Sequence, residues 1–168
     1  MRKFGLLLIS VLFLSFAQAQ DAKFQAMAIY NFTRTLQWPQ DSQTGNFVIT
    51  VLDDGDLYNE LVSFTEGKKV RGEQKIVVQK ASGMNIGKCQ ILVVPKSRNS
   101  ELVKIAGNYT SSGTLIVTEQ SNQVKKGAAV SFFKDDSDVI RYQYNAANIS
   151  SQNISVSTSF KQIGEEQE

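Results

Sequence analysis

The feature that most constrains the fold of this chain is a set of four short apolar runs rich in β-branched residues. They are FVITVL (residues 47–52), QKIVVQ (74–79), QILVV (90–94) and TLIVT (114–118). Apolar runs of this length are typical of parallel strands that are covered on both faces. Helical patterns separate the runs. We therefore expect an α/β fold, a single layered domain with a mostly parallel central sheet flanked by helices.

The first helical pattern spans residues 24–36. Its apolar residues form one broad face, which consists of Phe24, Met27, Ala28, Ile29, Phe32 and Leu36. We expect this helix to be largely buried. It should end before Trp38, because Trp38 precedes Pro39 and a residue before proline avoids helical geometry. Asn31 falls within the apolar sector, so we expect its amide to be buried and hydrogen-bonded.

Two further helices are expected between the apolar runs, at 57–65 with Asp56 as N-cap, and at about 100–107. Residues 154–163 end the fold with a short helix. The remaining sequence, GEEQE (164–168), is predicted to be a disordered acidic tail, because chain termini fray unless they are tied down.

Before that end, the chain changes character. Residues 128–134 and 139–145 flank the polar sequence DDSD and predict a C-terminal antiparallel hairpin. On its second strand, Ile140, Tyr142 and Tyr144 alternate with polar residues. One side of this strand is therefore predicted to be buried and the other to meet water.

Residues 1–19 have the pattern of a secretory signal peptide. Two basic residues precede an apolar run at 6–16, and a small-residue cleavage site ends at Ala19. The run is about eleven residues long, whereas roughly 20 are needed to span a bilayer. We expect a periplasmic mature chain, residues 20–168, that is a single domain and does not insert into a membrane.

The side-chain inventory argues against an enzyme. With no histidine in the chain, Ser/His/Asp and Cys/His catalysis and histidine-containing metal sites are excluded. Cys89 is the only cysteine, so an internal disulfide is also excluded, and its apolar neighbours indicate an inert core position. We expect no cofactor. The signal peptide carries both excess positive charges, and the neutral mature chain gives no reason to expect nucleic acid as a partner.

The densest polar cluster is DDGD, in which Asp53, Asp54 and Asp56 follow the first apolar run. Its simplest interpretation is turn and helix-capping chemistry. The alternative is the edge of a small-ligand site. A metal site is not expected, because the spacing is not that of a calcium loop.

In open α/β sheets, ligands bind outside the carboxyl ends of the strands. The loops at 53–56, 95–100 and 118–122 would converge there. The candidate ligand-binding residues are Asp53, Asp54, Lys96, Ser97 and Arg98.

A partner-binding surface is the other candidate site. Residues 53–66 are acidic and residues 68–88 are mostly basic, which indicates either two solvated faces or a two-signed surface that orients a protein partner. The candidate contacts are Arg34, on the polar side of the first helix, and Trp38, at the helix end beside Pro39. Two positions are open for Trp38: it either caps the core, which the sequence favours, or is half-exposed as an interface anchor.

Eight segments follow one another along the chain: AIYNFTRTLQWP, FVITVL, GKKVRGEQKIVVQ, CQILVVP, SGTLIVTE, KKGAAVSFF, VIRYQYNAANI and ISVSTSFKQI. In this order they resemble the YfiR family of bacterial periplasmic proteins, and the resemblance extends over residues 23 to about 163. The most specific elements are Tyr30-Asn31-Phe32 with Trp38-Pro39, the strand that Cys89 begins, and Arg141 to Asn145 after the hairpin that starts at Gly127.

The resemblance implies a non-enzymatic regulator that binds the periplasmic part of a membrane signalling protein. That partner would be a diguanylate cyclase or a sensor histidine kinase, with cyclic-di-GMP signalling and biofilm formation as the output. Similar members form homodimers. The best-described member is tuned by cysteine pairs, whereas this chain has only Cys89. The alternative function is a periplasmic small-molecule receptor.

Overall fold

The computed structural model describes residues 20–53, 55–83 and 86–168. The predicted signal peptide, residues 1–19, and the candidate ligand residue Asp54 lie outside the described residues. The descriptions below refer to the three ranges above.

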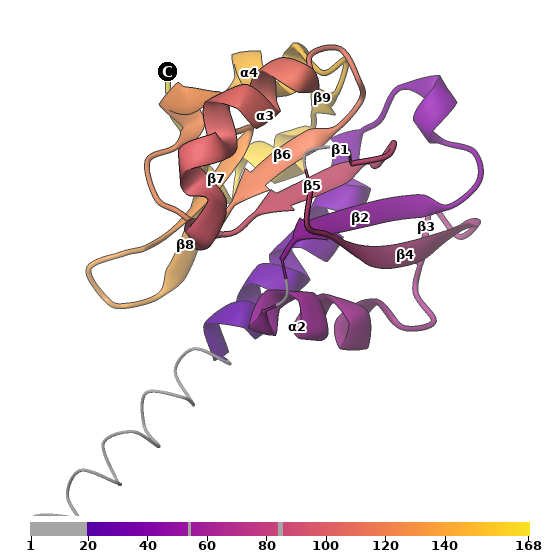
Figure 1. Cartoon of the computed structure of the whole chain (residues 1–168), viewed down its shortest axis with the longest axis horizontal. Coiled ribbons are helices and arrows are strands. Elements are labelled where there is room, and N and C mark those ends of the chain that lie inside the picture. Colours follow the sequence, from indigo (N-terminus) through magenta and orange to yellow (C-terminus); the bar gives the residue numbers. More distant parts are fainter. Residues whose placement is uncertain (1–19, 54, 84–85) are drawn as a thin grey trace, which may run out of the picture.

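A mixed sheet of eight strands forms the centre of the structure (Figure 1), in the order β10-β8-β7-β6-β5-β2-β4-β3. Its strands are β2 (Phe47–Leu52), β3 (Lys69–Val70), β4 (Gln74–Ala81), β5 (Ile91–Val94), β6 (Leu115–Thr118), β7 (Val130–Lys134), β8 (Ile140–Tyr144) and β10 (Glu165–Glu166). Strands β4, β2, β5, β6 and β7 are parallel to one another. The predicted α/β class with a mostly parallel sheet is confirmed.

The helices cover both faces of this sheet. They are the first helix (residues 20–35), α2 (Asp56–Thr65), α3 (Leu102–Asn108, preceded by the 3-10 helix η2, Lys96–Glu101), α4 (Ala146–Ser150) and α5 (Thr158–Lys161). Short 3-10 helices also occur at η1 (Gln40–Ser42) and η3 (Val124–Lys126). The N-cap of α2 is Gly55, without a side-chain cap, and Asp56 is the first helical residue. The prediction of Asp56 as N-cap is therefore wrong by one position.

Two cores lie on opposite faces of the sheet because alternate residues of each strand point to opposite sides. Ile49, Val93 and Val117 pack with the first helix in the larger core. Leu92 and Ile116 pack under α3 in the smaller one. The continuous apolar runs of the sequence thus reflect burial on both faces.

The first helix buries a narrower face than the sequence predicts. Phe24 and Met27 are 46% and 39% exposed, and Asn31 is also exposed. The buried stripe consists of Ala22, Gln25, Ala26, Ile29, Phe32 and Thr33. These positions follow the three-to-four residue spacing of one helical face. The prediction that Phe24, Met27 and Asn31 are buried is wrong.

The chain leaves the helix as a strand. Residues Leu36–Gln37 form β1, which pairs antiparallel with β9 (Ser155–Val156) in a separate two-stranded sheet. The next large side chain, Trp38, is 4% exposed and packs edge to face on Phe47, with ring centroids 5.0 Å apart. The prediction that Trp38 caps the core is therefore confirmed, and the half-exposed position is wrong.

The C-terminal hairpin is confirmed. β7 and β8 pair antiparallel, and Tyr142 and Tyr144 are buried. The predicted disordered tail is not observed, because Glu165–Glu166 form β10 parallel to β8, and the backbone N–H of Gln167 donates to the carbonyl of Tyr144 at 2.9 Å. The tail is ordered because its backbone pairs with free backbone groups at the edge of β8. The polar composition of the tail does not indicate this pairing.

Candidate functional site

The topology creates a switch point beside the central strand. From β2, the chain first places β4 on one side and then β5 on the other. The loop after β2 therefore leads toward β4, whereas the loop after β5 leads toward β6 on the opposite side. A crevice outside the carboxyl ends of strands at such a point is the usual ligand site in open α/β sheets.

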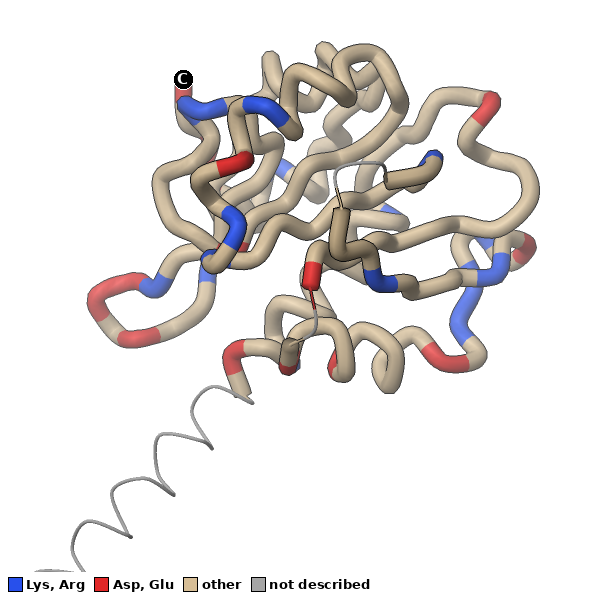
Figure 2. Tube along the Cα trace, viewed as in Figure 1, with Lys and Arg blue, Asp and Glu red and all other residues tan. Residues whose placement is uncertain are grey.

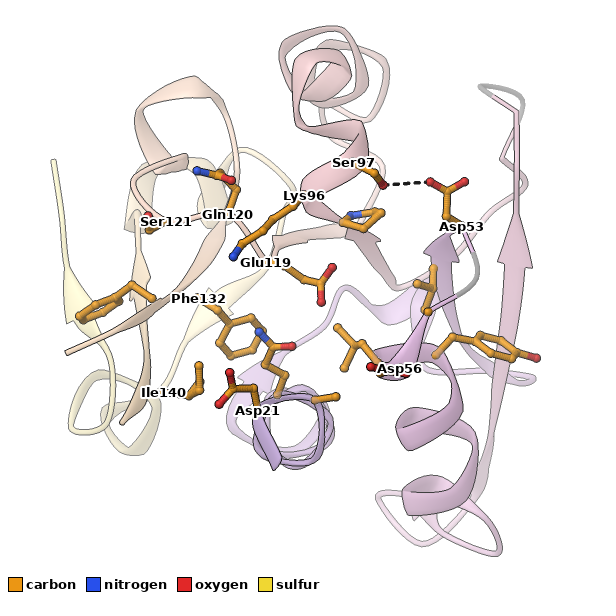
Figure 3. A pocket seen from close by; sticks show the side chains of 18 of the residues that line it. Asp21, Asp53, Asp56, Lys96, Ser97, Glu119, Gln120, Ser121, Phe132 and Ile140 are labelled. Carbon is orange, nitrogen blue, oxygen red and sulfur yellow. Dashed lines mark hydrogen bonds between the residues drawn. The ribbon is translucent and has the colours of Figure 1, made fainter. Parts of the chain in front are cut away.

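A cavity of about 840 Å³ opens at this point (Figure 3). Residues of all three loops that were predicted to converge line it, at 51–53 and 55–58, at 95–97 and at 119–122. The other wall comes from the first helix and the hairpin, through Asp21, Ala22, Gln25, Phe132, Phe133, Lys134, Ile140 and Gln143. The volume is within the range of small-molecule sites.

Asp53 ends β2 at the mouth of this cavity with an unusual backbone conformation. Its φ is 96°, which non-glycine residues seldom adopt. Its backbone N–H donates to the carbonyl of Ala81 at 3.2 Å, and Ser97 Oγ donates to Asp53 Oδ2 at 3.1 Å. Asp53 and Ser97 therefore meet as the sequence suggests, and local strain of this kind is often found at functional sites.

Arg98, in contrast, does not line the cavity. Its guanidinium makes a bidentate pair with Glu101, at 2.8 and 2.7 Å, and donates to the carbonyl of Ser82 at 2.9 Å. This pairing lowers the pKa of the Glu101 carboxyl. Arg98 thus braces η2 against the segment after β4, while its neighbours Lys96 and Ser97 turn toward the cavity.

Glu119 provides a half-buried carboxyl group in the lining of the cavity. Figure 3 shows its side chain projecting into the middle of the cavity, with Lys96 beside it. Desolvation by burial raises the pKa of Glu119, and the Lys96 ammonium and the Lys96 backbone amide oppose this rise. A carboxylate shifted in this way, inside a cleft, is a recognised mark of a functional site.

Two amide side chains in the wall have unmet hydrogen-bonding capacity. Gln25 is 7% exposed, and its side chain has no hydrogen-bond partner among the described residues. The Oε1 atom of Gln143 is buried, and within the same ranges it also has no partner. The Gln143 Oε1 atom is closed off from solvent, so only the Gln25 amide is available to an occupant of the cavity.

The charge of Lys134 at the rim is already paired. Lys134 Nζ lies 3.0 Å from Asp21 Oδ2 and 3.0 Å from Asp138 Oδ1. This network ties the hairpin to the first helix and raises the pKa of Lys134. Sequence reasoning missed Asp21, Gln25 and Gln143, because only the packing of distant elements brings them to the loops after β2 and β5.

The chemistry available elsewhere is limited. Among the described residues, no group of three or more potential ligands is placed to hold a metal ion. Cys89 is 1% exposed, and burial raises the pKa of its thiol to about 11, so its reactive thiolate form is suppressed. Within the ranges that the structure covers, no helix has the length and hydropathy needed to cross a bilayer.

A separate surface carries the candidate partner contact Arg34. This side chain is exposed, and its guanidinium carbon lies 6.0 Å from the centre of the Tyr30 ring. Lys68 Nζ lies 5.7 Å from the same ring and 4.1 Å from that of Phe64. We call Tyr30, Arg34, Phe64 and Lys68 the cation–aromatic patch. Trp38 is buried outside this patch and offers a partner almost no surface.

Comparison with known proteins identifies the family of the chain. No curated protein matches the sequence. Residues 22–164 match the profile of the family described as YfiR/HmsC-like, which covers the first helix, the sheet and the C-terminal hairpin. A match over this share of the chain shows that the protein belongs to the YfiR/HmsC-like family.

Proposed function

We propose that this protein is a non-enzymatic periplasmic regulator that binds the periplasmic part of a membrane signalling protein and controls its output. The observation that carries the proposal is the family match over residues 22–164, which suggests a periplasmic regulator of a cyclic-di-GMP pathway. The signalling protein would be a diguanylate cyclase or a sensor histidine kinase. Its activity would change because the regulator occupies the sensor, without chemistry on it.

The cation–aromatic patch supports binding of a protein. Tyrosine and arginine are enriched at the energetically important positions of interfaces, and Arg34 and Tyr30 lie together here. Figure 2 shows Lys and Arg residues gathered along β3 and β4, while α2 carries Asp and Glu residues. Such a two-signed surface would steer a partner and set its orientation.

A pull-down with the mature chain tests this proposal. The chain is tagged and expressed in the periplasm beside a membrane sensor encoded by a neighbouring gene. We expect the sensor to co-purify, and we expect cellular cyclic-di-GMP, or kinase output, to change when the regulator gene is deleted. Unchanged output after deletion, with no sensor recovered, would contradict the proposal.

The Arg34→Ala variant tests whether the cation–aromatic patch is the surface that binds the sensor. We expect it to weaken sensor binding by about tenfold, which corresponds to about 1.4 kcal/mol. The matched control is Lys104→Ala, because Lys104 is exposed on α3, away from the patch. An equal loss of sensor affinity in the two variants would show that Arg34 is not part of the interface.

The mature chain is also proposed to form a homodimer. Sedimentation of the purified chain over a range of concentrations measures this directly. A particle with the mass of one chain at all concentrations would contradict dimer formation.

The cavity favours a second candidate function, that of a small-molecule receptor. A space of about 840 Å³ at the switch point, lined by the unpartnered amide of Gln25, is suited to a ligand. A ligand that binds only the folded state raises the melting temperature by mass action. A thermal-shift screen of amines, carboxylic acids, nucleotides and sugars would identify such a ligand, and a screen without any shift would count against the receptor.

A further inference from the structure

The charge of the cavity is negative. Its described lining contains four carboxylates, those of Asp21, Asp53, Asp56 and Glu119, against the two ammonium groups of Lys96 and Lys134. Lys134 is already paired with Asp21 and with Asp138, and Asp138 adds a further negative charge beside the wall. Partly enclosed sites of one sign focus their field and concentrate ligands of the opposite sign. This cavity should therefore attract cations.

The start of α2 argues against an anionic ligand. In open α/β sheets, the helix N-terminus after the central strand is the usual place for a phosphate, because free backbone N–H groups point toward it. Here the segment before and within the first turn carries Asp53 and Asp56, and both line the cavity. Their carboxylates would repel a phosphate or a second carboxylate at this position.

A buried amide in the wall defines what the occupant must offer. The Gln25 side chain lines the cavity, is more than nine-tenths buried and meets no partner among the described residues. An ammonium group has three N–H donors, so it can satisfy an amide oxygen and a carboxylate together.

Glu119 is the natural centre of such a site. It is half-buried, and Figure 3 shows it between Lys96 and the carboxylates of Asp21 and Asp56, which come from the first helix and α2. Burial raises its pKa, and the nearby Asp56 contributes to that rise. A bound cation would stabilise the charged form of Glu119 more effectively than Lys96, which remains exposed to water.

We propose that the cavity binds a small aliphatic diamine, with Glu119 and the Gln25 amide oxygen as acceptors for one of its ammonium groups. The second ammonium group would lie among the remaining carboxylates, and the methylene chain would lie against Ile140. Two positive charges match the excess of two carboxylates in the lining. This inference rests on the second candidate function, the receptor, and specifies its ligand class.

Calorimetric titration of the mature chain with putrescine tests the proposal, with succinate as a dianion of similar length. We expect saturable binding of putrescine and none of succinate. Glu119→Gln should weaken putrescine binding by about tenfold, which corresponds to about 1.4 kcal/mol. The matched control, Glu73→Gln, should leave it unchanged, because Glu73 is exposed between β3 and β4 and does not line the cavity.

Lys96→Met distinguishes a cationic ligand from an anionic or zwitterionic one. Removing this ammonium should strengthen putrescine binding, because it removes a like charge beside Glu119. The matched control is Lys104→Met on α3, which should have no effect. The folded state of each variant is checked by Trp38 fluorescence, since the single tryptophan is buried.

Four results would overturn the diamine assignment. The first is the absence of saturable heat with putrescine up to about 10 mM, and the second is an equal loss of putrescine affinity in Glu119→Gln and Glu73→Gln. The third is weaker putrescine binding by Lys96→Met than by the wild type. The fourth is tighter binding of succinate than of putrescine. Saturable succinate binding that Lys96→Met abolishes would leave the receptor function intact with another ligand class. Absence of any thermal shift in the wider screen would contradict the receptor as well.

Discussion

The hydroxyl of Tyr144 donates a hydrogen bond to Oε2 of Glu166, with 3.1 Å between the two oxygens. This contact holds the acidic C-terminus against the sheet as β10, which pairs with β8 through its backbone. Gly164 makes the approach possible, because it lies directly against the rings of Tyr142 and Tyr144. The C-terminal segment is therefore part of the fold and covers a sheet edge that would otherwise be open.

Gly164→Ala should destabilise the protein. A Cβ at this position would overlap the Tyr142 ring and lie 2.8 Å from Tyr144 Cδ1. We expect a loss of about 1–3 kcal/mol, typical of overpacking, in urea unfolding followed by circular dichroism. Gly107→Ala is the matched control, because its Cβ would meet open space on α3, and it should stabilise by about 0.5–1 kcal/mol. Equal stability of Gly164→Ala and wild type would show that the tail is not packed here.

The protein should lose stability in alkaline solution. Burial raises the pKa of Cys89 from 9.0 to about 11, and those of Tyr109, Tyr142 and Tyr144 from 10.0 to about 12. Because the folded state holds these protons more tightly, the stabilisation is complete below pH 9 and is lost as the pH rises through 11 and 12. Urea midpoints measured from pH 8 to pH 12 should fall accordingly.

Tyr142→Phe provides the control for that effect. It removes one of the four titrating groups, so the free energy of unfolding should depend less steeply on pH above 10. An alkaline decline of the same slope in this variant would mean that other groups cause it.

Trp38→Ala should be among the most damaging single substitutions. The indole is 4% exposed and packs on Phe47, so its removal leaves a cavity that costs about 3–5 kcal/mol. Trp38→Phe should cost much less, because the buried Nε1 of Trp38 has no hydrogen-bond partner among the described residues and an aromatic ring is retained. Similar losses in the two variants, measured by circular dichroism, would indicate an indole hydrogen bond.

Glu119→Gln should raise the melting temperature near pH 7. Burial raises the folded-state pKa of Glu119, so the fold disfavours the charged form of this carboxyl group. The gain should disappear below the ordinary pKa of 4.5, where the wild-type carboxyl is protonated in both states. A variant less stable than wild type at pH 7 would show that the Glu119 carboxylate supports the fold.

Local pattern predicted a large part of the fold. The apolar runs became β2, β4, β5 and β6, and the two segments that flank DDSD became the hairpin of β7 and β8. The convergence of the three loops also followed, because parallel strands bring their carboxyl ends to one edge of a sheet. These features depend on side-chain alternation and chain direction, which neighbouring residues determine.

Only the tertiary structure decided which residues from distant parts of the chain lie together. Asp21, Gln25 and Gln143 join the cavity because the first helix and the hairpin pack against the switch point. Trp38 is buried and the acidic tail is ordered for a related reason, since each meets a surface formed by residues far away in the chain. Sequence by itself determined the main strands and their order along the chain, whereas burial, pairing at the sheet edge and the cavity's charge depend on non-local contacts that no local pattern encodes.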